Sequence, residues 1–171
     1  THRRSSAASD VYKRQGVHFT PDKKHIITAD VFNGKIYKTS IETKSSEIIY
    51  SHKYGVNVAI EDSTGSLWFT QSTENQNEER LFKALDKAVP DGALYRIPVS
   101  KDGTLSKPEL ILKNLYFANG FYIDEKRNKL YLSEMMKNRV LSFDLDILTG
   151  SVSNQTTLAV IPTPDNMELN L

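Results

Sequence analysis

From Gly16 onward, apolar residues alternate with polar ones over short runs, and turn-forming residues separate these runs. A period of two is typical of strands that are buried on one face. Apolar residues at helical spacing recur in one segment, EERLFKALDKAV, which places Leu81, Phe82, Leu85 and Val89 on a single stripe. The pattern therefore predicts an all-β protein with one short inserted helix.

The predicted strands belong to a repeat. GVHFTPDKKHIITAD (16–30) aligns without a gap with GFYIDEKRNKLYLSE (120–134), and VNVAIEDSTGSLWFTQ (56–71) is a third copy. PDNMELNL (164–171) matches the start of a fourth. A spacing of about 40 to 50 residues between copies is typical of a four-stranded propeller blade, and the longer middle spacing contains the helical insertion, 73–91.

Each complete copy is followed by two more strand patterns. These cover residues 35–41 and 46–50, then 93–99 and 109–113, then 139–144 and 156–161. Residues 16–171 therefore predict about three blades and the start of a fourth, which is an incomplete β-propeller. Because closure of the ring covers the sheet faces, we expect an open arc with exposed apolar surface that folds poorly alone.

The first fifteen residues, THRRSSAASDVYKRQ, are Ser-rich and basic and have no apolar period, so residues 1–15 are excluded from the predicted fold. The string DVYKRQ resembles a translated sequencing adapter, which predicts an artefact of an assembled gene fragment. A flexible tail is the alternative. On the first interpretation the natural N-terminus is missing.

Charge and composition limit the partners. The chain has 22 Lys and Arg against 21 Asp and Glu, a net charge of +1 and no basic stripe with interleaved aromatic residues, so nucleic acid is not an expected partner. No apolar run approaches the roughly 20 residues that span a bilayer, so no membrane span is expected. The absence of cysteine excludes thiolate chemistry and leaves a cytoplasmic or periplasmic location open.

Polar residues recur where the first strand of each predicted blade begins. Asn57, Asn119 and Asp165, with Asn166 beside it, lie at or near equivalent repeat positions. First strands line the channel of a propeller, and oxygen ligands from several blades suit calcium. A single Asn before a strand is also explained by a turn or cap. The repeat therefore favours the metal site and the structural role about equally.

Nucleophilic triad chemistry has no recognisable signature in this chain. The sequence contains no Gly-x-Ser-x-Gly elbow, and its four histidines have no partners at a recognisable spacing. His52 precedes a predicted channel strand and is the histidine best placed for catalysis. For all four histidines, surface or strand packing is the favoured interpretation.

Several segments resemble a known superfamily. YFANGFYIDEKRNKLYLSE (116–134) resembles a signature of paraoxonases and strictosidine synthase-like proteins, and PDNMEL (164–169) resembles their next-blade motif. DSTGSLWFT (62–70) and ITADVFNGKIYK (27–38) resemble blade segments of gluconolactonases and diisopropyl fluorophosphatase. Nearly all of residues 16–171 is thus similar to the SMP-30/gluconolactonase/LRE-like superfamily of six-bladed propellers.

The resemblance implies a calcium ion at the channel centre, held by one Glu, two Asn and one Asp. Asn119 matches an Asn ligand and Asp165 matches the Asp, with Asn166 joining it as in paraoxonase-like members. The position of the other Asn ligand depends on the alignment. Counting back from Trp68 places Asn57 at this position, whereas aligning the apolar strand that follows, residues 58–60, places Val56 at it.

The Glu ligand belongs to a blade before Gly16. The fragment alone is therefore expected to be inactive. For the intact protein, the resemblance implies a calcium-dependent hydrolase of lactones or esters, of the gluconolactonase or arylesterase type. Asp165 is the expected catalytic residue, because a metal-bound carboxylate facing the substrate orients or deprotonates water. The alternatives are a strictosidine synthase-like propeller without metal catalysis and a propeller that only binds ligands.

Overall fold

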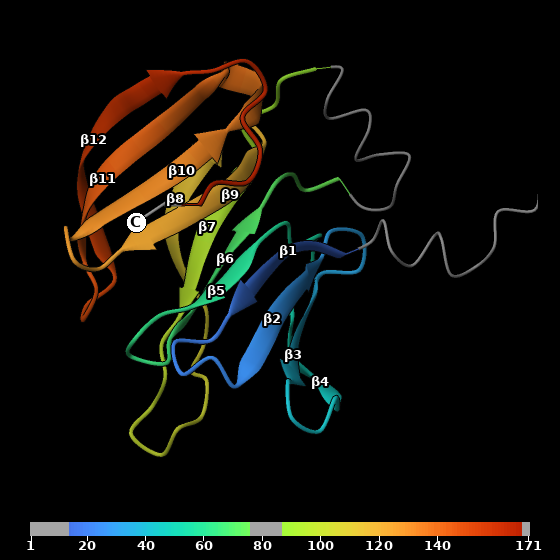
Figure 1. Ribbon diagram of the computed structural model, residues 1–171. Coiled ribbons are helices and arrows are strands. Elements are labelled where there is room, and N and C mark those ends of the chain that lie inside the picture. The colour runs from blue at the N-terminus through green and yellow to red at the C-terminus, as the bar shows by residue number, and fades with distance from the viewer. Residues whose placement is uncertain (1–13, 76–86, 169–171) are drawn as a thin grey trace, which may run out of the picture.

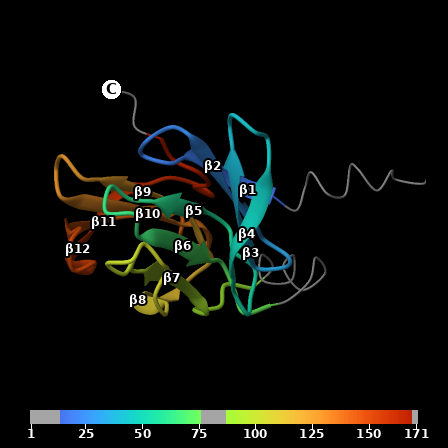
Figure 2. The ribbon, with the colours of Figure 1, turned by 90° about the horizontal axis from the view of Figure 1, so that it is seen from below.

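The computed structural model describes residues 14–75 and 87–168, and this part of the chain is built from β-strands and one 3-10 turn. The strands form three four-stranded antiparallel sheets, ordered β1-β2-β3-β4, β5-β6-β7-β8 and β9-β10-β11-β12. Sequential strands pair throughout each sheet, as in propeller blades. The sheets fan out side by side with β5–β8 in the middle (Figures 1 and 2). The predicted all-β partial propeller is confirmed.

The strand boundaries follow the repeat closely. The strands are β1 Arg14–Phe19, β2 His25–Asp30, β3 Lys35–Ser40, β4 Ser46–Ser51, β5 Ala59–Glu61, β6 Leu67–Gln71, β7 Gly92–Ile97, β8 Glu109–Leu115, β9 Ala118–Asp124, β10 Lys129–Glu134, β11 Arg139–Asp146 and β12 Ser151–Val160. The 3-10 turn η1 covers Met135–Lys137.

Both β12 and β1 begin earlier than the sequence pattern predicts. β12 begins at Ser151 instead of residue 156, because the chain reverses at once through a turn closed by Gly150 N and Asp146 O. β1 begins at Arg14, which pairs with Asp30, so strand pairing extends two residues before Gly16. Most of the predicted helix, residues 76–86, lies outside the described residues.

Aspartates organise the first hairpin of two blades. Asp62 follows β5, and its Oδ1 accepts hydrogen bonds from the main-chain nitrogens of Thr64 and Ser66, while its Oδ2 accepts one from Trp68 Nε1 at 2.7 Å. In the next blade, Asp124 Oδ1 accepts from the Arg127 nitrogen at 3.1 Å. Such side-chain bonds satisfy turn nitrogens that strand pairing leaves free.

The core consists of two apolar layers between adjacent sheets. The layer between the first two sheets includes Ile27, Ile36 and Phe69, and the layer between the second and third includes Trp68 and Phe121. Because β6 lies in the middle sheet, both of its faces are covered and all five of its residues are buried. Large side chains at successive positions of one strand therefore pack into different layers.

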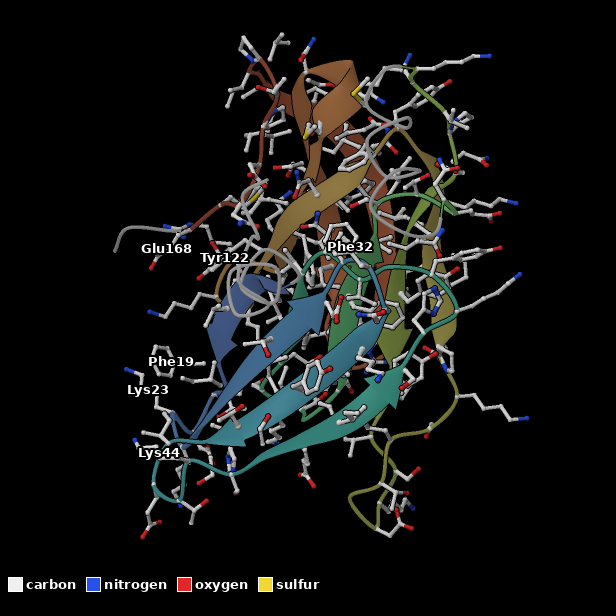
Figure 3. The ribbon with its side chains drawn as sticks, turned by 90° about the vertical axis from the view of Figure 1, so that its right-hand side faces the viewer. Phe19, Lys23, Phe32, Lys44, Tyr122 and Glu168 are labelled. Atoms are coloured by element: carbon white, nitrogen blue, oxygen red, sulfur yellow. The ribbon has the colours of Figure 1, made fainter. Side chains whose placement is uncertain are left out.

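The outermost sheets carry exposed apolar side chains, as the open-arc prediction requires. Val17 and Phe19 on β1 are 63% and 62% exposed, and Figure 3 shows Phe19 projecting away from the strands. On β12, Leu158 is 59% and Val160 is 80% exposed.

Arg96 on β7 clamps the middle sheet to the third. Its guanidinium is buried and donates to the main-chain oxygens of Thr149 at 3.2 Å, Leu148 at 3.2 Å and Ile147 at 3.3 Å. It also lies 5.6 Å from the Trp68 ring, within the range of a cation–π contact. One charged group thus satisfies three carbonyls of the β11–β12 turn.

Candidate functional site

Strand pairing places Asn57 and Asn119 at equivalent positions of neighbouring blades. Ile60 pairs with Trp68 in the middle sheet, and Tyr122 pairs with the equivalent Tyr131 in the third. Each asparagine lies three residues before the first member of its pair. Of the two alignments open from the sequence, the structure therefore selects the one that equates Asn57, and not Val56, with Asn119.

Both asparagines present a buried oxygen that has no donor. Asn57 is 2% and Asn119 is 3% exposed, and neither Oδ1 atom has a hydrogen-bond partner among the described residues. The other two unpaired buried side-chain atoms in the described part of the chain are Thr28 Oγ1 and Arg96 Nε. An unsatisfied buried oxygen costs about 1–3 kcal/mol, so two at equivalent positions require a common explanation.

Thr70 connects the main chains at these two positions. Its main-chain oxygen accepts a hydrogen bond from the Asn57 nitrogen at 2.9 Å. Its hydroxyl donates to the Asn119 oxygen at 2.9 Å and accepts from the Val58 nitrogen at 3.3 Å. The side chain is fully buried, so Thr70 fixes how the two blade starts lie relative to each other.

Asp165 and Asn166 continue the series on the segment after β12. A Cβ atom added to Gly120 would lie 2.6 Å from Asn166 Cα and 2.8 Å from the Asp165 oxygen. A Cβ on Gly16 would meet the corresponding atoms of the next blade start, 3.1 Å from Val58 Cα and 3.2 Å from the Asn57 oxygen. The structure thus brings Asp165 and Asn166 beside the Asn119 position, in the same relation that Asn57 has to the first blade.

The backbone supports the equivalence of Asp165 and Asn119. Phe117 and Thr163 each lie two residues before these positions, and both have left-handed backbones, with φ of 58° and 44°. This conformation is a strained one for a β-branched or aromatic residue. The side chains of Asp165 and Asn166 are exposed, whereas the two blade asparagines are buried.

Met135 orients the Asn119 amide. Asn119 Nδ2 donates to Met135 Sδ at 3.3 Å, which leaves Oδ1 as the free end of the side chain. Sequence reasoning missed both Met135 and Thr70. At the position of Thr70 the other two blades have Ala29 and Ser133, so the repeat gives no signal for this residue.

His52 lies in an aromatic cluster between the first two blades. Its ring centroid is 5.0 Å from that of Phe69 and 4.9 Å from that of Tyr95, and its Nε2 is 2.9 Å from Gln71 Oε1. Burial lowers the pKa of His52, and the contact with Gln71 opposes this shift. The packing role favoured from the sequence agrees with this geometry.

The donor set at the blade starts contains only oxygen. Within residues 14–75 and 87–168, no group of three or more His, Cys, Asp and Glu side chains gathers into a metal site. The amide oxygens of Asn57 and Asn119, with the carboxylate of Asp165 and the amide of Asn166, are hard ligands of the type that calcium takes. The two orphaned amide oxygens fit a cation in this respect.

Comparison with known proteins gives a family match. The family model described as the SMP-30/Gluconolactonase/LRE-like region matches residues 51–168, which is most of the chain. The chain belongs to the SMP-30/gluconolactonase/LRE-like family. The family match includes Asn57, Asn119, Asp165 and Asn166. A search of curated protein sequences gives no match.

Solved structures with this fold include two named enzymes. A gluconolactonase from Xanthomonas campestris is 17% identical, with a TM-score of 0.63, and the alignment covers 90% of this chain and 51% of that one. A luciferin-regenerating enzyme is 16% identical, with a TM-score of 0.50 and coverage of 85% and 60%. This chain thus spans between half and three fifths of their lengths.

Within residues 14–75 and 87–168, no helix has the length and apolar character needed to cross a membrane.

Proposed function

We propose that this chain is part of a six-bladed, calcium-dependent hydrolase that acts on small lactones or esters. The observation that carries the proposal is the pair of buried, unpartnered amide oxygens on Asn57 and Asn119. A cation between them would compensate the cost of burying both. Family membership supports a lactonase-type propeller, and arylesterase activity is the related alternative.

Asn57, Asn119, Asp165 and Asn166 would hold the calcium ion, together with a Glu that the family resemblance assigns to a blade outside this chain. When bound, calcium polarises a carbonyl and stabilises the charge that develops on its oxygen. Asp165 is the proposed catalytic residue, and its side chain is exposed. It would accept a proton from the water that attacks the carbonyl carbon and return it to the departing alkoxide as the C–O bond breaks.

The test is calcium binding, measured by calorimetry on the complete propeller that contains this chain. Asn119→Ala and Asp165→Ala should each weaken calcium affinity at least tenfold, about 1.4 kcal/mol, and abolish hydrolysis of gluconolactone. Asp102→Ala is the matched control, because it removes one negative charge from an exposed turn of the middle blade. The 171-residue chain alone should bind more weakly than the complete protein.

Two results would reject the proposal. Absence of calcium binding in the complete protein would leave a strictosidine synthase-like propeller without metal chemistry, or a ligand-binding propeller. Binding that Asp102→Ala weakens as much as Asp165→Ala would show a general charge effect instead of a site.

A further inference from the structure

Asn119 can present either of two chemically opposite ends. Its amide carries an oxygen that accepts hydrogen bonds or binds cations and an NH₂ group that donates to anions. The two ends have nearly the same shape, so rotation by half a turn would exchange them with little change in packing. Some neighbour must therefore select which end faces the ligand.

The neighbour that makes this choice is Met135. Asn119 Nδ2 donates to Met135 Sδ at 3.3 Å, and a thioether sulfur accepts a hydrogen bond but has no proton to donate to an amide oxygen. If the Asn119 amide were rotated by half a turn, its Oδ1 would face the lone pairs of the Met135 sulfur, and two acceptors would meet without a proton between them. The contact therefore favours the orientation in which Oδ1 is the free end, as the structure has it.

The main chain around Met135 is anchored to the residues that precede β9. The Met135 nitrogen donates to the Phe117 oxygen at 3.1 Å, and the Met136 nitrogen donates to the Tyr116 oxygen at 3.1 Å. The preceding residue, Glu134, is almost fully buried, accepts from the Tyr116 nitrogen at 2.8 Å and pairs with Arg139 Nε at 2.6 Å. These contacts tie η1 to the two residues that lead into β9.

We propose that Met135 is a positioning residue that fixes the Asn119 amide with its oxygen free, and thereby makes this position select cations over anions. This role rests on the proposed cation site, but the orientation of Asn119 can be measured without a bound ion. The residues equivalent to Met135 are Val31 in the first blade and Ser72 in the second, so only the third blade has a sulfur acceptor at this position.

The first measurement is the side-chain amide spectrum of Asn119 by NMR in the complete, ion-free protein. Met135→Leu keeps the volume and removes the acceptor, so the Nδ2 proton that faces the sulfur should shift in frequency. Met136→Leu is the matched control, because this neighbour is also half-buried and the Asn119 amide donates to Met135 instead. An Asn119 signal that responds to neither substitution, or equally to both, would overturn the proposal.

The second measurement is a double-mutant cycle on calcium affinity. Met135→Leu should weaken binding by about three- to tenfold, which matches the net value of one hydrogen bond. In an Asn119→Asp background it should have no effect, since a carboxylate presents an oxygen in either orientation. An equal loss in both backgrounds would show that Met135 acts through packing, and would overturn the proposal.

If the complete protein binds no calcium, the proposed function fails while the NMR result still decides whether Met135 holds Asn119. The two failures are thus distinguishable.

Discussion

The Thr70 hydroxyl donates a 2.9 Å hydrogen bond to the main-chain oxygen of Asn119, across the boundary between the second and third blades. The same hydroxyl accepts from the Val58 nitrogen, so one buried group joins the starts of two channel strands. The geometry of the candidate site therefore depends on a residue that is not itself a candidate ligand.

Thr70→Val keeps the shape of this side chain and removes both hydrogen bonds. The Asn119 oxygen and the Val58 nitrogen would stay buried without a partner, so the free energy of unfolding should fall by about 1–3 kcal/mol in urea denaturation. Thr104→Val is the control, because its hydroxyl bonds to Asp102 in an exposed turn. A loss as small as that of the control would show that Thr70 does not join the blades.

Removal of the Arg96 clamp should separate the middle and third blades. Arg96→Met retains much of the apolar stem but leaves three turn carbonyls without their charged donor, so stability should fall by about 2–4 kcal/mol. Lys129→Met is the control. Its side chain is 39% exposed and pairs with Asp144, which is 42% exposed, so its loss should leave the unfolding free energy nearly unchanged. Similar effects of the two substitutions would contradict the clamp.

Gly120→Ala should displace the segment that carries Asp165 and Asn166. The backbone of Gly120 is not left-handed, so an alanine there would cause no backbone strain. Its Cβ would instead clash with the neighbouring segment, at 2.6 Å from Asn166 Cα. Amide hydrogen exchange across residues 164–168 should accelerate. Gly103→Ala meets no atom within 4 Å and adds only left-handed strain, about 1–2 kcal/mol, so exchange at 164–168 should not change. Unchanged exchange in Gly120→Ala would reject this contact.

Acidification should destabilise the packing of the first two blades through His52. Burial lowers its folded-state pKa below the ordinary value of 6.5. Well above pH 6.5 the His52 ring is neutral in both the folded and the unfolded protein. At lower pH the unfolded chain binds a proton more readily than the folded one. Stability should therefore decrease as the pH falls from about 6.5 through the lowered folded-state pKa.

The check is the free energy of unfolding of wild type and His52→Gln between pH 5 and pH 7.5. The substitution should flatten part of the acid side of the profile. Burial also lowers the pKa of His18, with Glu168 opposing the shift, so His18 contributes in the same direction and His18→Gln should be measured separately. Identical profiles for wild type and His52→Gln would contradict the assignment.

Local sequence was sufficient to predict the blades. Alternation of apolar and polar residues defines the strands, and aspartates such as Asp62 satisfy the turn nitrogens within the next few residues. The repeat also predicted where the channel strands begin, and hence Asn57, Asn119 and Asp165 as candidates. Whether they bind calcium is still a prediction. The start of β12 was misplaced because residues 151–155 are polar and carry little strand periodicity.

The sequence by itself determined the blade repeat, the turns and the family, because each depends on residues that are close together in the chain or recur with the repeat. Only the tertiary structure decided that Asn57 and not Val56 is equivalent to Asn119, since that requires the pairing register of two strands. It also decided the contacts of Thr70 and Arg96 across blades. These contacts join residues about 50 positions apart that have no repeated counterpart, and such pairs form only when the sheets pack together.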